Sequence, residues 1–305
     1  MDMLEFLKSE GVSPQILEEI ADCRRRWAVG DTVKGRIPEP AYHYYGREIW
    51  EQAAAALLSG EHLLLVGPKA TGKNVLAEGL AAAFGRPAWD VSFYINIDAA
   101  SLIGADTFAD GKVSLRKGPI LRCAEEGGFG VLDEINMAKN ESLAVLHATL
   151  DFRRVIDVPG YDRIVLSDAT RFIATMNYGY AGTREINEAL ASRFMVINMP
   201  IISGENLEKL LRAQFPTLKG AYARQMAELF QEIRAKCDGG EISTKALDLR
   251  GLLASVRLMY NGLAPRAALG MGIVNKCFDS FERQLVEDLI AVRLPATLAP
   301  AELFD

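Results

Sequence analysis

A glycine-containing stretch between a predicted strand and a predicted helix constrains this chain more than any other feature. It reads GPKATGKN over residues 67–74, after the apolar run 62–66 and before the helix-like run 75–81. Glycines let the backbone curl so that successive N–H groups point inward, and a helix start adds partial positive charge. The pattern therefore predicts a phosphate-binding loop rather than a plain turn, with Lys73 reaching the outer phosphates. The residues expected to contact the ligand are Gly67, Lys69, Ala70, Thr71, Gly72, Lys73, Asn74 and Val75.

Polar residues follow two further apolar runs, each typical of a buried strand. Asp133 and Glu134 follow the run 129–132, and Asn177 follows the run 171–176. Open α/β sheets bind ligands at the carboxyl ends of their strands. We therefore expect Asp133 to hold Mg²⁺ or its water, Glu134 to polarise an attacking water, and Asn177 to orient that water. A lone Asp-Glu pair is more often an acidic loop, and a lone Asn a turn residue, but the nearby glycine loop favours the functional interpretation.

The residue after Lys73 departs from the usual pattern, which places a Ser or Thr there whose hydroxyl binds Mg²⁺. Asn74 offers an amide oxygen that Mg²⁺ accepts directly or through water, but it also carries an NH₂ group that cannot face a cation. Asn74 and Asp133 are therefore both candidate metal ligands, and we expect the metal to depend more on Asp133. Slow hydrolysis is the expected consequence.

Charge and cysteine content narrow the functional class. The 305 residues carry a formal net charge of −6 at pH 7, which argues against a broad basic surface for nucleic acids. The four cysteines lie far apart without a CxxC pair, so free thiols are favoured over disulfides or a metal site. The acidic N-terminus does not resemble a signal peptide, and no apolar run is long enough to span a bilayer. We expect a soluble, cytoplasmic protein.

The order of these patterns predicts three regions. Residues 1–45 read as a helical extension in which the arginines 24–26 form a solvated face. Residues 46–200 alternate strands and helices, whereas residues 201–305 carry helical periodicity alone. The expected fold class is therefore α/β: a core of parallel strands with helices on both faces, followed by a small all-helical lid domain.

Two interruptions within the core contain recognisable turn residues. Residues 98–118 include several glycine turns, which predict a helix interrupted by an inserted loop. Residues 155–166 read as a β-hairpin that turns near Pro159 and Gly160. Each interruption precedes an apolar run that ends in candidate site residues.

Four motifs in order, GPKATGKN, FGVLDEIN, ATMN and NEALASRF, followed by an all-helical tail, resemble those of the AAA+ ATPases. The resemblance runs from about residue 45 to residue 268 and leaves out the N-terminal extension. DEIN after an interrupted helix, and a hairpin before ATMN, resemble the MoxR-type branch. The tail is similar to the CbbQ/NorQ group in reading LRGL at 249–252 and NGLAPRAA at 261–268.

The resemblance implies how the loop and the residues ahead of it bind ATP or ADP. Gly67, Gly72 and Lys73 would hold the phosphates. Tyr45 and Gly46, which precede the helix leading into the loop strand, would lie over the adenine base.

The resemblance also implies roles for three polar residues outside the loop. Asn177 resembles the sensor 1 residue, Arg193 is placed like an arginine finger acting on nucleotide in a neighbouring subunit, and Arg250 is placed like sensor 2. Each arginine has a plainer interpretation when taken alone. Arg193 would then pair with a carboxylate such as Glu188, and Arg250 would be a solvated helix residue.

The resemblance finally implies partners. Such proteins form homo-oligomeric rings, commonly hexamers, and MoxR-type members act as chaperone-like activators, often with a partner that bears a von Willebrand A domain. An ATP-hydrolysing, Mg²⁺-dependent ring that remodels a protein client is therefore expected. Two alternatives stay open: a nucleotide-binding regulator with little hydrolysis, which Asn74 favours, and a nucleic-acid motor, which the negative net charge disfavours.

Overall fold

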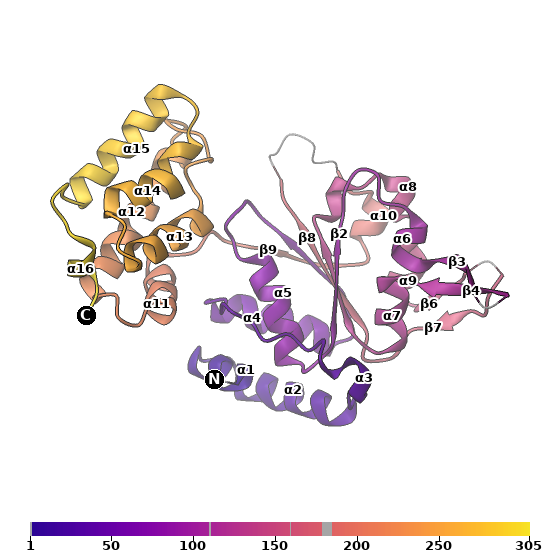
Figure 1. Ribbon diagram of the computed structural model, residues 1–305. Coiled ribbons are helices and arrows are strands. Elements are labelled where there is room, and N and C mark those ends of the chain that lie inside the picture. Colours follow the sequence, from indigo (N-terminus) through magenta and orange to yellow (C-terminus); the bar gives the residue numbers. More distant parts are fainter. Residues whose placement is uncertain (1, 110, 159, 179–184) are drawn as a thin grey trace. The chain divides into compact units, whose positions relative to one another are not determined.

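The structure is a computed structural model that describes residues 2–109, 111–158, 160–178 and 185–305. The chain divides into two compact units, Met1–Pro200 and Ile201–Asp305, and each is described by itself (Figure 1). The division falls where the sequence changes from alternating strands and helices to helices alone. The first 45 residues fall within the first unit.

Five strands of the first unit form one sheet in the order β2-β5-β8-β1-β9, and all neighbouring strands run parallel. The expected α/β fold with a parallel sheet is therefore confirmed. Because parallel strands end at the same edge, the residues that follow β1, β5 and β8 meet there. The strands are β1 (Leu63–Val66), β2 (Ala88–Ser92), β5 (Phe129–Asp133), β8 (Arg171–Met176) and β9 (Met195–Asn198).

Side chains of β1 alternate between two buried clusters, one on each face of the sheet. Leu63 and Leu65 belong to the cluster formed with α1, α2, α4 and α5, whereas Leu64 and Val66 belong to the cluster formed with α6 to α9. A strand buried on both faces is apolar throughout, which explains the run before the loop. The helices are α1 (Met3–Ser9), α2 (Pro14–Arg26), α4 (Arg47–Leu58), α5 (Lys73–Ala83), α6 (Ala99–Ile103), α7 (Pro119–Glu125), α8 (Asn140–Leu143) and α9 (Leu146–Leu150).

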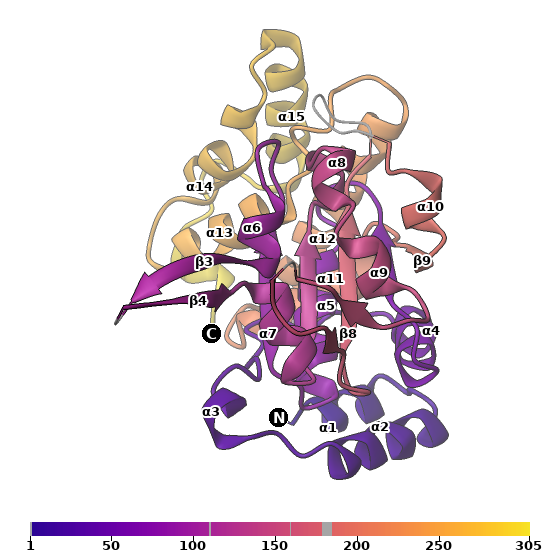
Figure 2. The same ribbon diagram turned by 90° about the vertical axis from the view of Figure 1, so that its right-hand side faces the viewer.

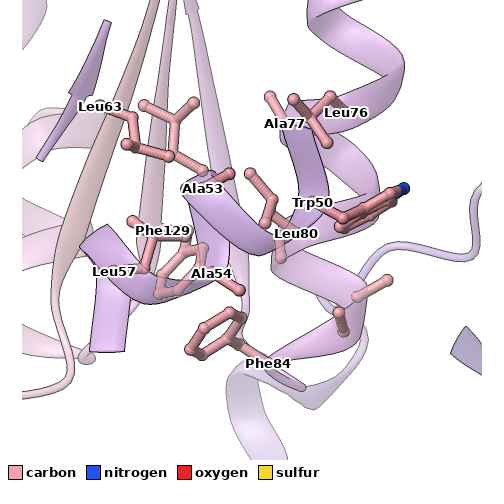
Figure 3. Close-up of a cluster of buried hydrophobic side chains, with 14 of the residues drawn as sticks. Trp50, Ala53, Ala54, Leu57, Leu63, Leu76, Ala77, Leu80, Phe84 and Phe129 are labelled. Atoms are coloured by element: carbon pink, nitrogen blue, oxygen red, sulfur yellow. The ribbon is translucent and has the colours of Figure 1, made fainter. Parts of the chain in front are cut away.

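Trp50 lies among the buried side chains of α4 and α5 (Figure 3), and a glycine of α5 sets how closely it approaches. A Cβ on Gly79 would lie 2.8 Å from Trp50 Cη2, so only glycine permits this approach. Trp50 is buried, and its Nε1 donates a hydrogen bond to Tyr44 O at 2.8 Å. This hydrogen bond fixes the residues that precede α4.

A buried histidine ties β1 to both neighbouring strands. His62 O accepts a hydrogen bond from Met195 N at 2.8 Å, and His62 Nδ1 accepts one from Phe172 N at 3.1 Å. Burial, together with the nearby Arg154 and Arg171 cations, lowers the pKa of His62 to about 3. The ring is therefore neutral at neutral pH, as its acceptor role requires.

An arginine of the N-terminal segment caps the helix that follows the glycine loop. Arg24 donates from Nε to Ala83 O at 2.7 Å and from Nη2 to Ala82 O at 2.9 Å. A cation there satisfies the last carbonyls of α5 and interacts favourably with the helix dipole. Arg25 and Arg26 are exposed, but the expectation of a solvated face is wrong for Arg24, which is half-buried.

Two antiparallel hairpins interrupt the first unit (both labelled in Figure 1, the first also in Figure 2). The predicted interruption of residues 98–118 is a hairpin between α6 and α7. The hairpin predicted over residues 155–166 is confirmed, while its expected turn residue Pro159 lies outside the described residues. Tyr161 Oη donates a hydrogen bond of 2.6 Å to Asp106 Oδ1, which joins the two hairpins. Their strands are β3 (Gly104–Ala109), β4 (Lys112–Lys117), β6 (Val155–Ile156) and β7 (Ile164–Val165).

The second unit is built from helices. Gly251 and Gly272 let α13 and α14 approach closely, since a Cβ on either would overlap the other's backbone. Ser255 Oγ, buried between them, lies 2.8 Å from Gly251 O and 2.9 Å from Ala268 O. Among the described residues, no helix is both long and apolar enough to cross a membrane. The main helices are α11 (Gly204–Gln214), α12 (Gly220–Asp238), α13 (Leu249–Tyr260), α14 (Pro265–Gly272), α15 (Ser280–Arg293) and α16 (Pro300–Leu303).

Candidate nucleotide-binding site

The glycine loop connects the end of β1 to the start of α5, as predicted. Gly72 (φ +78°) and Ala70 (φ +64°) both adopt the left-handed conformation, which glycine reaches without strain. A Cβ on Gly67 would lie 2.8 Å from Met199 O, so the neighbouring chain after β9 requires glycine there. Thr71 is buried and donates from Oγ1 to Pro68 O at 3.0 Å, which holds the loop curled.

Lys73 is 7% exposed and its ammonium is held inside the loop. Nζ donates to Gly67 O and to Pro68 O, each at 2.8 Å, and lies 3.2 Å from Thr71 Oγ1. Burial lowers the pKa of Lys73 to about 8, although the nearby carboxylates of Asp133 and Glu134 act to raise it. The ammonium therefore stays mostly protonated at pH 7 and lies close to both acidic residues.

Glu134 follows β5 in a strained backbone conformation. Its φ of +54° and ψ of +46° are left-handed, which costs a non-glycine residue roughly 1–2 kcal/mol. The Glu134 carboxylate accepts a hydrogen bond at Oε1 from Asn177 Nδ2 at 2.8 Å. The structure therefore brings together the acidic pair and the amide that were predicted from separate strands.

Two buried polar residues that were not among the predicted site residues support this arrangement. Thr175 Oγ1 donates to Asp133 Oδ1 at 2.6 Å and accepts from Glu134 N at 3.0 Å. Asn136, in a 3₁₀ turn after β5, donates from Nδ2 to Asn177 O at 2.7 Å. The sequence offered one signal for Thr175, because it is a polar residue inside the apolar run of β8.

The aromatic residue against the loop is Tyr44. A Cβ on Gly72 would lie 3.0 Å from Tyr44 Cδ2, and a Cβ on Gly46 would lie 3.0 Å from Tyr44 Cε1. Burial raises the pKa of Tyr44 to about 12. The ring of Tyr45 instead packs edge-on against Phe6, with 5.5 Å between centroids. The placement of Tyr45 and Gly46 over adenine stays a prediction, and the structure puts a different ring beside the loop.

Three further candidates lie on exposed or half-exposed parts of the loop and α5. Asn74 is exposed in the first turn of α5, and Val75 beside it is half-buried. Lys69 is exposed on the loop itself. Direct coordination of a metal by Asn74 stays a prediction.

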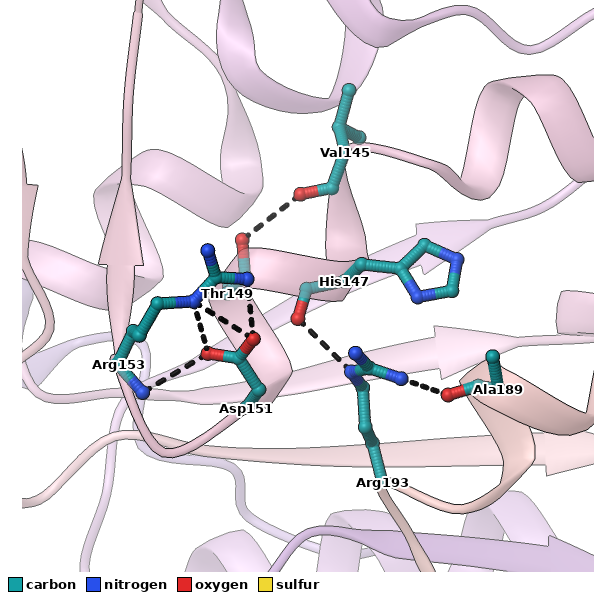
Figure 4. A network of polar contacts seen from close by, with 7 residues as sticks. All are labelled: Val145, His147, Thr149, Asp151, Arg153, Ala189 and Arg193. Carbon is teal, nitrogen blue, oxygen red and sulfur yellow. Dashed lines mark hydrogen bonds and ion pairs between the residues drawn. The ribbon is translucent and has the colours of Figure 1, made fainter.

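The two predicted catalytic arginines lie in different units. Arg193 follows α10 (Glu188–Ala191), and its guanidinium donates to His147 O at 3.1 Å and to Ala189 O (Figure 4). Its described bonds are therefore to backbone carbonyls. Arg250 is exposed in the first turn of α13. Both assigned roles stay predictions.

The groups at this edge of the sheet fit a nucleotide with a divalent cation. The left-handed loop residues and the start of an eleven-residue helix supply N–H groups for phosphate oxygens. Lys73 supplies a buried positive charge. Asp133 and Asn74 offer carboxylate and amide oxygens, the ligand type that Mg²⁺ prefers. A parallel sheet with this loop and these carboxylates defines a P-loop nucleotide-binding protein.

Comparison with known proteins gives the family. The model of the AAA domain (dynein-related subfamily) matches residues 62–194. The uncharacterized protein YojN of Bacillus subtilis is 33% identical over 258 residues, which are 83% of this chain and 84% of YojN. An uncharacterized protein of Staphylococcus haemolyticus is 31% identical over 79% of this chain and 94% of its own length. The chain therefore belongs to the AAA+ ATPase family, with an AAA domain of the dynein-related subfamily.

Among solved structures, a mutant of Thermotoga maritima RuvB is similar with a TM-score of 0.49. The sequence identity is 17%, and the match covers 81% of this chain and 70% of the RuvB chain.

Proposed function

We propose that this protein binds ATP and hydrolyses it to ADP and phosphate with the help of Mg²⁺. The observation that carries this proposal is the 2.8 Å hydrogen bond from Asn177 Nδ2 to Glu134 Oε1, beside the buried Lys73 ammonium. A fixed carboxylate, an amide and a buried cation at the end of a parallel sheet are the groups that phosphoryl transfer to water needs.

Each residue has a defined part in the reaction. Lys73 exchanges its bonds to loop carbonyls for charge-assisted bonds to phosphate oxygens, which are stronger. Glu134, oriented by Asn177, accepts a hydrogen bond from the attacking water and draws its proton away. The water oxygen bonds to the terminal phosphorus as the bond to the bridging oxygen breaks, and ADP leaves. Asp133 and Asn74 would hold Mg²⁺, which neutralises charge on the phosphates.

The first test replaces Glu134 by glutamine, which keeps the side chain's shape but removes its basicity. Turnover of ATP by the purified full-length chain is expected to fall by about 10²–10⁴-fold, the usual contribution of a general base. Nucleotide affinity, measured by calorimetry, is expected to change little. Glu126→Gln, at an exposed carboxylate after α7, is the matched control and should keep wild-type turnover. Equal turnover by the wild-type protein and Glu134→Gln would contradict the proposal.

A second candidate function is a nucleotide-binding regulator that hydrolyses little ATP. The exposed Asn74 side chain, where relatives of the P-loop class carry a metal-binding hydroxyl, is the observation that favours it. Asn74→Thr is expected to raise turnover by about tenfold, the equivalent of one net hydrogen bond. The variant should also increase the dependence of nucleotide affinity on Mg²⁺, while ADP affinity without metal stays unchanged. Lower turnover in Asn74→Thr would mean that asparagine is an adapted ligand.

We further propose that the protein assembles as a homo-oligomeric ring, a hexamer in the simplest case, and remodels a protein client. Support comes from the MoxR-type motif order, the CbbQ/NorQ-like tail and the position of Arg193 at the end of α10. A partner with a von Willebrand A domain is part of this proposal, and a cytoplasmic location would suit it. The net charge of −6 makes a nucleic-acid motor the weaker alternative.

A further inference from the structure

One hydroxyl group lies between the two acidic residues of the candidate site. Thr175 is 1% exposed, and its Oγ1 donates to Asp133 Oδ1 at 2.6 Å while it accepts from Glu134 N at 3.0 Å. A hydroxyl has a single proton, so these two bonds fix its orientation and leave Asp133 as the acceptor. The short distance is typical of a hydroxyl bonded to a carboxylate.

Thr175 is itself held rigidly. It lies in β8 between β5 and β1, where its backbone pairs in register with Leu65. Asn177, two residues further along the chain, carries the amide that contacts Glu134. Two residues at the end of β8 and just after it therefore hold the acidic pair. Thr175 bonds the Asp133 carboxylate and the Glu134 N–H, and Asn177 bonds the Glu134 carboxylate.

The backbone of Glu134 needs such support. Its left-handed conformation is unfavourable for a residue with a Cβ, and strained residues persist only where surrounding contacts determine them. The bond from Glu134 N to Thr175 Oγ1 is one such contact, and it lies in a buried part of the site where an unpaired N–H is costly.

We propose that Thr175 is a positioning residue for ATP hydrolysis. Its hydroxyl fixes the Asp133 carboxylate that would hold the cation, and it holds Glu134 in the conformation that directs its carboxylate to Asn177. The inference rests on the proposed ATPase function and adds to it a residue that acts through its contacts with Asp133 and Glu134. Because the Asn74 amide carries an NH₂ group that cannot face a cation, we expect Mg²⁺ to depend more on Asp133, which Thr175 orients.

The test uses Thr175→Val, which keeps the branched shape and removes the hydroxyl, and Thr175→Ser, which keeps the hydroxyl. Thr170→Val is the matched control: Thr170 is fully buried just before the opposite end of β8, and its hydroxyl bonds the carbonyls of Cys123 and Ala124, away from the acidic pair. All variants are made in the full chain. ADP affinity is measured by calorimetry with and without Mg²⁺, and Glu134 amide exchange is measured without nucleotide.

In Thr175→Val, the factor by which Mg²⁺ raises ADP affinity is expected to fall about tenfold, and ATP turnover about 10- to 100-fold. These are the losses expected when a hydrogen bond to a charged group is removed. The ADP affinity of Thr175→Val without Mg²⁺ should stay within about threefold of wild type, since no loop residue is changed. The Glu134 amide should exchange faster. Thr175→Ser should restore all three properties, and Thr170→Val should lower only the melting temperature.

The inference would be overturned if Mg²⁺ raised ADP affinity as much in Thr175→Val as in the wild type and the Glu134 amide exchanged at the wild-type rate. It would also be overturned if Thr170→Val lost as much of the Mg²⁺ effect on ADP affinity as Thr175→Val. Failure of the proposed function is distinguishable, because it would show as no turnover in the wild-type protein. The metal-dependent affinity and the amide exchange do not require turnover and would still decide the role of Thr175.

Discussion

Replacing Lys73 with alanine is expected to abolish measurable nucleotide binding while the fold remains intact. Lys73 supplies the buried ammonium of the loop, and charge-assisted bonds to phosphate are stronger than those from the backbone N–H groups that remain. The loss of two such bonds corresponds to about 10²–10⁴-fold in affinity. Calorimetric titration with ADP, alongside a thermal melt, measures both parts of the expectation.

Folding should tolerate the Lys73 substitution because the ammonium is buried unfavourably. Burial lowers its pKa to about 8, so the protonated form is held less easily in the folded protein than in the unfolded chain. Lys69→Ala, at the exposed lysine of the same loop, is the comparison: because Lys69 is exposed and Lys73 is buried, Lys69→Ala should lower ADP affinity much less than Lys73→Ala. Wild-type ADP affinity in Lys73→Ala would show that the loop does not bind phosphate.

Arg193→Ala is expected to lower ATP turnover by about 10³–10⁵-fold, the range for an arginine supplied to a neighbouring active site. The effect should fall on turnover more than on nucleotide affinity. In the structure the guanidinium is bonded to the carbonyls of His147 and Ala189, so a role in trans requires it to exchange these bonds for a nucleotide phosphate of the neighbouring subunit (Figure 4). Steady-state turnover at several protein concentrations measures the effect.

Mixing experiments separate a role in trans from a local structural role of Arg193. Inactive Arg193→Ala and inactive Glu134→Gln subunits should partly restore activity when mixed. At some interfaces the first subunit then supplies an intact Glu134 and the second an intact Arg193. Arg153→Ala is the control. Arg153 bonds both carboxylate oxygens of Asp151, which directly follows α9, the helix whose His147 carbonyl Arg193 contacts. Turnover per subunit that is independent of concentration in an active monomer would rule out the trans role.

Much of the fold could be predicted because local patterns determine it. The uninterrupted apolar run of β1 indicates burial on both faces of a parallel sheet. Gly67 permits the close approach of Met199, and Gly72 permits a left-handed turn. The strands before Glu134 and Asn177 were predicted for the same reason. Their carboxyl ends meet because the strands are parallel neighbours, and the 2.8 Å contact between the two side chains follows.

Residues that act through contacts distant in sequence escaped prediction. Thr175 bonds residues about forty positions away, and no periodicity marks such a contact. Tyr44 and Tyr45 are adjacent and chemically alike, so only the packing of α4 decides which ring meets the loop and which meets Phe6. The hairpin within residues 98–118 was predicted only as a loop, because the alternation of Val113 and Leu115 with polar residues in β4 is short and lies between glycine turns.

The cap that Arg24 places on α5 means that the recognisable nucleotide motifs are not the whole determinant of this site. The helix that offers its first turn to phosphate is anchored at its last turn by a side chain from α2, outside residues 62–194 that the family model matches. A substitution of Arg24 would therefore leave the last carbonyls of α5 without this partner, although every motif residue of the loop is unchanged. A binding partner that contacts α2 would likewise affect the loop through α5, from the end of the helix that is far from the nucleotide.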